Sequence, residues 1–226
     1  MTRRLPVCSS TDSGSCSTGA KAWSTRARGR FLYLYDPESD VTVADGEPIR
    51  DIATIWDVEV LSAFLGRDDL RPVIRGSLDH FGRLIVECDE YAMVAPSGEP
   101  SSIAHSAFLA LALCRSELPD KIRQLTPLID GVLHQQRKDG SYKIFFAAEP
   151  DSGEELYPAE AMLALLEAYH LTRDARHLDS VERSFVHYKR TYYDRGRVRP
   201  DLLVLFANGQ SRAGRLLLEA TTTPKV

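Results

Sequence analysis

Basic clusters and long apolar runs are both missing from this chain of 226 residues. It has 28 Lys and Arg against 32 Asp and Glu, a net charge of −4, and no block of five basic residues. Contact with a phosphate backbone needs a concentrated basic stripe, so we expect no nucleic-acid partner. No apolar run approaches the roughly 20 residues of a membrane span, and the N-terminus lacks an apolar stretch of secretory-signal length. We therefore expect a cytoplasmic protein that makes no membrane contact.

Cysteine pairs are also missing. The four cysteines are Cys8, Cys16, Cys88 and Cys114, and none belongs to a C-x-x-C pair. The first two lie in a Ser-rich leader and the other two in predicted core helices. A disulfide framework requires a small, exported, cysteine-dense chain, so we predict reduced thiols.

Motifs for cofactors and for a serine nucleophile are missing as well. The chain contains no G-x-x-x-x-G-K-[ST], no G-x-G-x-x-G and no G-x-S-x-G. His170, His177 and His187 are spaced by 7 and 10 residues, which does not place all three on one face of a helix. No compact acidic or cysteine cluster completes them. We predict no metal and no cofactor.

A sizeable core is present, because hydrophobic residues make up 43% and charged residues 27% of the chain. Residues 1–29 are polar and of low complexity, which predicts a disordered leader before a single domain over 30–226. The aromatic alternation in 30–35 predicts a short strand, and residues 36–48 are expected to form a loop.

From Ile49 onward nearly every periodic segment is helical. The predicted helices cover about 49–66, 69–88, 101–116, 119–137, 157–171, 174–193 and 200–218. Pro127 lies inside the fourth of them and is expected to kink it or delay its start.

The helices form a repeat. The segment after Asp174 resembles the segment after Asp68, which lies 106 residues earlier, and Ala161 to Leu165 matches Ala107 to Leu111 at an offset of 54. A helical hairpin of about 53 residues, used three times, explains both offsets.

Connections alternate in length. Turns within a hairpin are short, whereas residues 91–100, 140–156 and 194–199 form long connections with strand-like aromatic stretches. Long loops therefore collect at one end of the array, where function usually lies. The first, third, fifth and seventh helices begin at that end and are the more apolar ones, which predicts inner helices whose N-termini face one mouth.

This arrangement resembles the (α/α) toroid of six-hairpin carbohydrate enzymes and terpene-type cyclases. The segment from Tyr157 to Leu178 resembles the helix–turn–helix unit of glucuronyl C5-epimerases and N-acylglucosamine 2-epimerases, with Ala159 and Arg173 where those families have Gly. His134 to Tyr142 is similar to the Gln-x-x-x-Gly-x-Trp element of squalene-type cyclases, with Tyr for Trp. The acidic signature of class II terpene cyclases and the zinc pattern of lanthionine cyclases are missing.

The resemblance implies an all-α fold, part of an (α/α) toroid with short β-hairpin-like loops at one mouth. A closed toroid needs about six such units, roughly 320 residues at this period. We expect either a truncated product or a half-ring that a second chain closes.

Two residues are the first candidates for acid/base chemistry. His105 lies one turn inside the third helix, after Ser101 and Ser102, and Glu160 lies one turn inside the fifth. Each is the kind of group that exchanges a proton near neutral pH. The alternatives are a core histidine bonded to a backbone carbonyl and a carboxylate favoured by the helix dipole.

Other candidates suit sugar binding. Trp56 beside Asp57, in the second turn of the first helix, combines a stacking surface with an acceptor, although a core Trp is the alternative. Asp57 with Glu160 is the pair for glycoside cleavage, which requires two carboxylates. The remaining substrate-binding candidates are Tyr142, Tyr157, Asn208, Gln210 and Arg50.

From the resemblance we predict a sugar-acting enzyme of the epimerase/isomerase or glycosidase kind, with His105 and Glu160 as its first acid/base pair. The alternatives are a non-catalytic binding or scaffold domain derived from a toroid, or a terpene-type cyclase. The helix N-termini and Arg50 favour an anionic sugar as the small-molecule substrate.

The last predicted helix, 200–218, opens a fourth hairpin without an outer partner in this chain. Exposed apolar area of this kind marks an interface or an aggregation liability. We therefore expect a homodimer through the helices at 49–66 and 200–218, or else an unstable fragment.

Overall fold

The computed structural model describes most of the chain from Gly46 to Gly196 and shorter pieces on either side. The described residues are 24–25, 29–32, 34–43, 46–147, 149–150, 152–196, 214–216, 218–219 and 222.

Helices dominate the described residues. They are α2 (Pro48–Leu65), α3 (Arg71–Gly82), α4 (Ile103–Arg115), α5 (Lys121–His134), α6 (Tyr157–Thr172) and α7 (Ala175–Tyr188). A 3₁₀ turn, η1 (Asp68–Leu70), precedes α3, and a π-helical turn, η2 (Lys189–Tyr193), follows α7.

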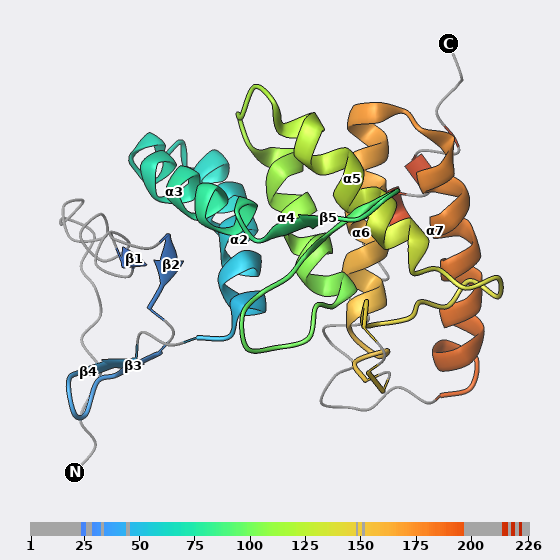
Figure 1. Ribbon diagram of the computed structural model, residues 1–226, viewed down its shortest axis with the longest axis horizontal. Coiled ribbons are helices and arrows are strands. Elements are labelled where there is room, and N and C mark those ends of the chain that lie inside the picture. The colour runs from blue at the N-terminus through green and yellow to red at the C-terminus, as the bar shows by residue number, and fades with distance from the viewer. Residues whose placement is uncertain are drawn as a thin grey trace.

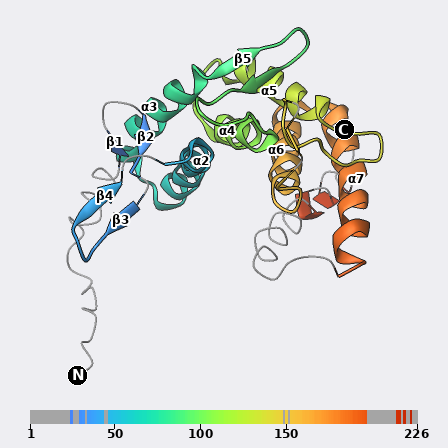
Figure 2. The same cartoon turned by 60° about the horizontal axis from the view of Figure 1, so that its bottom comes forward.

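The helices form three consecutive hairpins arranged in two layers. α4 packs between α2 and α6, and all three run in the same direction (Figure 1). Their partners α3, α5 and α7 return along the other side, so the array curves with α2, α4 and α6 on its inner side (Figure 2). The predicted helical repeat is thus present. Closure into a toroid is not shown.

Connection lengths alternate as predicted. Only Gly66 and Arg67 separate α2 from η1, and only Arg173 and Asp174 separate α6 from α7. Gly66 and Arg173 occupy matching turns, and both end their helix in the left-handed conformation, at φ of 62° and 58°. The segments before α4 and α6 are long, so long loops gather where α2, α4 and α6 begin.

Those long loops contain strand pairing. β5 (Ile85–Glu87) and β6 (Ala92–Val94) form an antiparallel hairpin before α4. The loop before α6 pairs with the start of α4, where the Ile103 amide donates to the Ile144 carbonyl at 2.9 Å and Ser102 bridges Phe145. The two long loops are therefore one connected structure.

Two predictions for the 69–88 segment are wrong. Its helix ends at Gly82, and Ile85–Glu87 is a strand, because the β-branched pair Ile85 and Val86 suits a strand that β6 can pair with. Cys88 follows that strand and is half-buried instead of lying in a core helix, whereas Cys114 is buried in α4 as predicted.

The 119–137 helix is shorter than predicted, from Lys121 to His134, and it continues on both sides of Pro127. The expected loop over 36–48 contains β4 (Val41–Val43), which pairs with β3 (Leu34–Asp36).

The predicted 30–35 strand is divided between β2 (Arg30–Phe31) and the start of β3. β1 (Ser24–Thr25) pairs with β2 and lies inside the range predicted as leader, whose other residues, except Gly29, are outside the described part. Arg30 joins this N-terminal region to α2, because its Nε donates to the buried Asp51 carboxylate at 2.7 Å.

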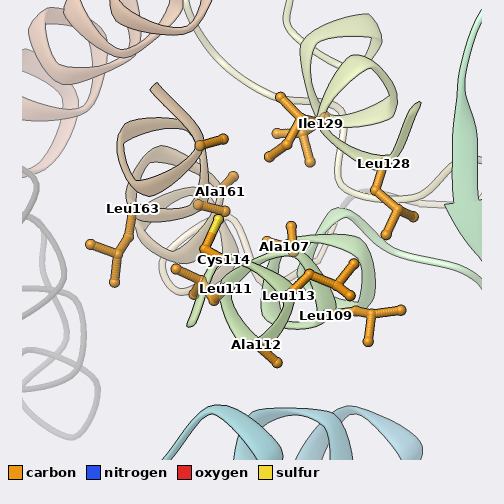
Figure 3. Close-up of a cluster of buried hydrophobic side chains, with 14 of the residues drawn as sticks. Ala107, Leu109, Leu111, Ala112, Leu113, Cys114, Leu128, Ile129, Ala161 and Leu163 are labelled. Atoms are coloured by element: carbon orange, nitrogen blue, oxygen red, sulfur yellow. The ribbon is translucent and has the colours of Figure 1, made fainter. Parts of the chain in front are cut away.

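The core lies around α4, which is buried along almost its whole length. Figure 3 shows its side chains with Ala161 of α6 on one side and Leu128 and Ile129 of α5 on another. The small side chains of Ala107 and Ala161 permit close approach of α4 and α6. A helix that is apolar all round is an interior helix, as the sequence predicts.

The end of the chain is only partly described. Residues 214–216 are helical, Gly214 lies against the Phe185 ring and Leu216 packs on the core. On α2, Val60, Leu61, Phe64 and Leu65 are exposed, Phe64 to 83%. Dimerisation through this helix stays a prediction.

Candidate functional site at the N-terminal ends of three parallel helices

The starts of α2, α4 and α6 lie at one end of the array, which we call the N-terminal mouth (Figure 1). α2 and α6 each begin with a proline in the first turn, Pro48 and Pro158, where a missing amide hydrogen costs nothing. α4 begins after Ser102, which forms a capping box with His105. The first-turn prolines and the capping box therefore set where each helix begins, and with it which side chains lie at the mouth.

His105 is engaged at both ring nitrogens. Its Nδ1 accepts a hydrogen bond from the Ser102 amide at 3.2 Å and lies 2.8 Å from the Ser102 hydroxyl oxygen. Because Nδ1 is an acceptor, the neutral ring carries its proton on Nε2, which donates to Glu99 Oε1 at 3.0 Å. The ring therefore caps α4 and orients the Glu99 carboxylate.

Burial lowers the pKa of His105, and the hydrogen bond to Glu99 opposes that change. Only 3% of His105 is exposed. This surrounding matches the alternative of a satisfied core histidine more closely than a ring that faces an open cavity. A catalytic role for His105 stays a prediction.

Glu160 lies one turn inside α6, as the sequence predicts. Its side chain is half-buried, and Oε2 makes no hydrogen bond with any residue of the described part of the chain. Burial raises the pKa of Glu160 to about 7, although a bond from its own backbone amide acts the other way. Near neutral pH this carboxyl group is therefore present in both protonation states.

Tyr157 connects the three helix starts. The loop before α6 packs on its ring, since a Cβ at Gly153 would lie 2.9 Å from it. Burial, and then the nearby charges of Glu47, Glu160 and Glu99, raise the pKa of the Tyr157 hydroxyl. The hydroxyl is thus within electrostatic reach of a carboxylate from each helix start.

Arg50 also belongs to the mouth. Its Nε donates to Glu47 at 3.0 Å, and its charge lowers the pKa of Tyr157. Both members of this ion pair are largely exposed, so it contributes little stability and leaves the guanidinium accessible.

Trp56 and Asp57 lie in the third turn of α2 and not in its second turn as predicted, although the helix begins at Pro48, within one residue of its predicted start. At 1.5 Å per residue, Asp57 is about 14 Å from the start of α2, whereas Glu160 is about 5 Å from the start of α6. Asp57 is exposed and Trp56 packs against the core. The structure therefore does not place Asp57 at the depth of Glu160.

Tyr142 does not project over the mouth, and that prediction is wrong. It is fully buried against α7, where its amide donates to the Tyr188 hydroxyl at 2.8 Å and its own hydroxyl lies 3.3 Å from Ser180 Oγ. Gly140 brings the loop onto α7 at φ of 91°, with the Arg183 carbonyl 2.5 Å from where a Cβ would be. The predicted Asn208 and Gln210 lie outside the described residues.

Sequence reasoning missed Glu99. It lies in the long loop before α4, six residues before His105, and no periodic pattern marks it. The pairing is visible only once the capping box fixes the direction of the His105 ring.

No family model and no curated protein matches this chain. Over the described residues, no helix has the length and apolar character needed to cross a membrane. The same residues contain no group of three or more His, Cys, Asp or Glu side chains arranged to hold a metal ion.

Proposed function

We propose that this protein is an acid/base enzyme that acts on a sugar, of the epimerase/isomerase or glycosidase kind, and that its hairpins form part of an (α/α) toroid. The N-terminal mouth is its active site in this proposal. Glu160 and the Glu99–His105 pair are the acid/base groups, and Tyr157 and Arg50 contact the substrate.

The observation that supports this proposal best is the state of Glu160. A general acid or base is most effective when its pKa lies near the working pH, and burial brings the pKa of Glu160 to about 7. Its Oε2 atom is buried and has no hydrogen-bonding partner among the described residues, an unfavourable state that a hydrogen bond from a substrate hydroxyl would relieve.

Glu99 supplies the second group that this chemistry requires. Epimerisation beside an activating group removes a proton from one face of a carbon and returns a proton to the other, which needs two acid/base groups. Glu99 is held by His105 on α4 and Glu160 stands on α6, with Tyr157 near both. Placement of one carboxylate on the loop before α4 and the other on α6 is compatible with approach to one sugar from two directions.

An anionic sugar suits the mouth better than a neutral one. Three helix N-termini carry partial positive charge there, and Arg50 is exposed beside them. Glu47 and Glu99 act against this preference. The expected difference in affinity is therefore small.

Proton exchange in heavy water tests the proposal. The chain is incubated in D₂O with a glucuronate or an N-acylglucosamine, and NMR follows deuterium entering at the epimerised carbon. Glycoside cleavage is followed with aryl glycosides of the same sugars. We expect turnover with at least one of them and a change in rate around pH 7, where Glu160 titrates.

Substitutions at the mouth test which of its side chains contribute to the rate. Glu160→Gln is expected to lower kcat/KM by about 10²- to 10⁴-fold, the usual contribution of a general acid or base. Glu182→Gln, at an exposed position on α7, serves as the matched control and should leave the rate unchanged. Equal activity of Glu160→Gln and the unaltered protein would contradict the proposal.

A non-catalytic sugar-binding domain is the second candidate, and the state of His105 favours it. Both ring nitrogens of His105 are engaged inside the protein, so the ring has a sufficient structural role. Saturable binding of the same sugars without deuterium exchange or cleavage would support this candidate over an enzyme.

A further inference from the structure

A cavity of about 380 Å³ lies at the end of the array opposite the N-terminal mouth. It is formed between the first two hairpins, from the C-terminal half of α2, from α3, and from the end of α4 with the turn that follows. Its volume falls in the range of small-molecule sites. None of the groups assigned to the mouth lines it.

Glu59 of α2 is the most unusual group in the wall of this cavity. Only 8% of the residue is exposed, and its Oε2 forms no hydrogen bond with any described residue. Burying such an atom without a partner is costly, so an uncompensated carboxyl group that faces a cavity points to a ligand. Glu59 therefore marks the part of the cavity where a polar contact is needed.

Most other charged groups around the cavity are already paired. Arg71 crosses from α3 to bind Asp68 at 2.8 Å and also Glu117. Arg115 donates to Glu167 of α6 at 3.1 Å. Neither arginine needs a ligand to complete its contacts.

The two serines of the cavity are committed as well. The Ser62 hydroxyl donates to the Arg67 carbonyl at 2.5 Å, and the Ser116 hydroxyl donates to the Leu113 carbonyl at 3.0 Å. Both bonds stay within the local backbone. The serines are therefore not the groups that recognise a ligand.

Arg75 differs from these neighbours. It stands on α3 at the exposed side of the cavity and makes no ion pair or side-chain hydrogen bond with any residue in the described part of the chain. Ile74 and Leu78 on the same helix supply apolar wall. The cavity thus offers one uncommitted carboxyl group inside, one uncommitted guanidinium outside, and apolar surface between them.

We propose that this cavity binds a small organic anion, a carboxylate or a phosphate ester with an apolar body, whose anionic group takes hydrogen bonds from Glu59 and Arg75. The apolar body packs against Ile74, Leu78 and Leu118. This site is independent of the proposed reaction at the mouth.

The charges around Glu59 favour an anion over a cation. The charged and titratable groups that face this region are Asp68, Arg71, Arg75, Cys114, Arg115, Glu117, Lys121 and Glu167. Four of these eight are cationic and three are acidic, and each of the three acidic groups is already paired with Arg71 or Arg115. An ammonium group placed beside Glu59 would therefore meet like charges on several sides.

The protonation state of Glu59 agrees with this choice. Burial raises its pKa to about 8, even though Lys121 and Arg115 act in the opposite direction. At neutral pH the carboxyl group is therefore mostly protonated and donates a hydrogen bond to an anionic oxygen. A ligand that needs this donor binds more weakly as the pH rises past 8, while a cationic ligand would bind more tightly.

Three probes of similar shape and different charge test the proposal: benzoate, phenyl phosphate and benzylamine. Binding is measured by titration calorimetry, and amide chemical shifts of the labelled full-length chain locate the site. We expect saturable binding of benzoate or phenyl phosphate that shifts the amides of Ile74 and Leu78. Whichever of the two binds more tightly identifies the head group.

The pH dependence gives a second test. Affinity for the anionic probe should fall by about tenfold between pH 7 and pH 9, as expected for a donor with a pKa near 8. Glu59→Gln keeps a donor and loses the titration, so it should bind at pH 7 and show no such fall.

Arg75 is tested by comparison with a second exposed arginine. Arg75→Gln should weaken the anionic probe by tenfold or more, and Arg123→Gln on α5, outside the cavity, should leave its affinity unchanged. Tighter binding of benzylamine, an affinity that rises with pH, equal effects of the two arginine variants, or no saturable binding of any probe would overturn the proposal.

Discussion

Glu59 should make the protein less stable as the pH rises. In the folded state its pKa is about 8, whereas an accessible glutamate titrates near 4.5. Between these two values the folded protein holds more protons than the unfolded chain. The free energy of unfolding therefore falls as the pH rises through this window and levels off above pH 8.

The size of the effect follows from the separation of the two pKa values. Each pH unit within the window removes up to about 1.4 kcal/mol, so the whole window removes on the order of 3 to 5 kcal/mol. This is a large part of the 5 to 15 kcal/mol that stabilises an ordinary domain. Because only 8% of Glu59 is exposed, water screens the effect very little.

Glu59→Gln isolates this contribution, because glutamine has nearly the same shape and does not titrate. Urea unfolding is measured for both proteins at several pH values from 5 to 9. The variant should gain stability relative to the unaltered protein with each step up to pH 8. Any constant cost of the buried amide, and the pH dependence due to Glu160, cancel in the change of this difference.

Glu182→Gln, an exposed position on α7, is the matched control, and its stability should follow that of the unaltered protein at every pH. Parallel curves for Glu59→Gln and the unaltered protein would refute the reasoning. They would show that the Glu59 carboxyl is solvated in the folded protein.

Two further substitutions test packing and backbone conformation. Tyr188→Phe should lower the free energy of unfolding in urea by about 1 to 3 kcal/mol, because it leaves the buried Tyr142 amide without its acceptor, and unchanged stability would contradict the hydrogen bond. Arg173 has a φ of 58°, and its guanidinium lies over the Tyr169 ring at 5.6 Å. Both Arg173→Gly and Arg173→Ala lose the ring contact, but only glycine relieves the strain of the left-handed conformation. Arg173→Gly should therefore be more stable than Arg173→Ala by about 1 kcal/mol and have the higher melting temperature. Equal melting temperatures of those two variants would argue against strain at this turn.

Local patterns in the sequence were sufficient to predict the helices and their pairing. The 3.6-residue period, the prolines in the first turns of α2 and α6, and Gly66 at the end of α2 all act within a few residues of the chain. The alternation of short and long connections follows from these bounds and places the long loops at one end. The helical periodicity gave the wrong prediction at residues 85–87, because strand formation there depends on pairing with β6, which begins seven residues after the start of β5.

The positions of individual side chains were decided by tertiary packing. Tyr142 follows a turn signal that looks like an exposed loop, yet α7 covers it completely. Glu99 becomes part of the candidate site only because the capping box of α4 turns the His105 ring toward it.

Glu59 occupies an ordinary position on a helix in the sequence, and its burial depends on α4 and the turn after it, more than 50 residues away. A sequence pattern determines which residues are apolar and how they are spaced. The hydration of a given carboxyl group is determined by the residues that pack against it. For Glu59 and Glu160 that packing sets the pKa, and with it the protonation state near neutral pH.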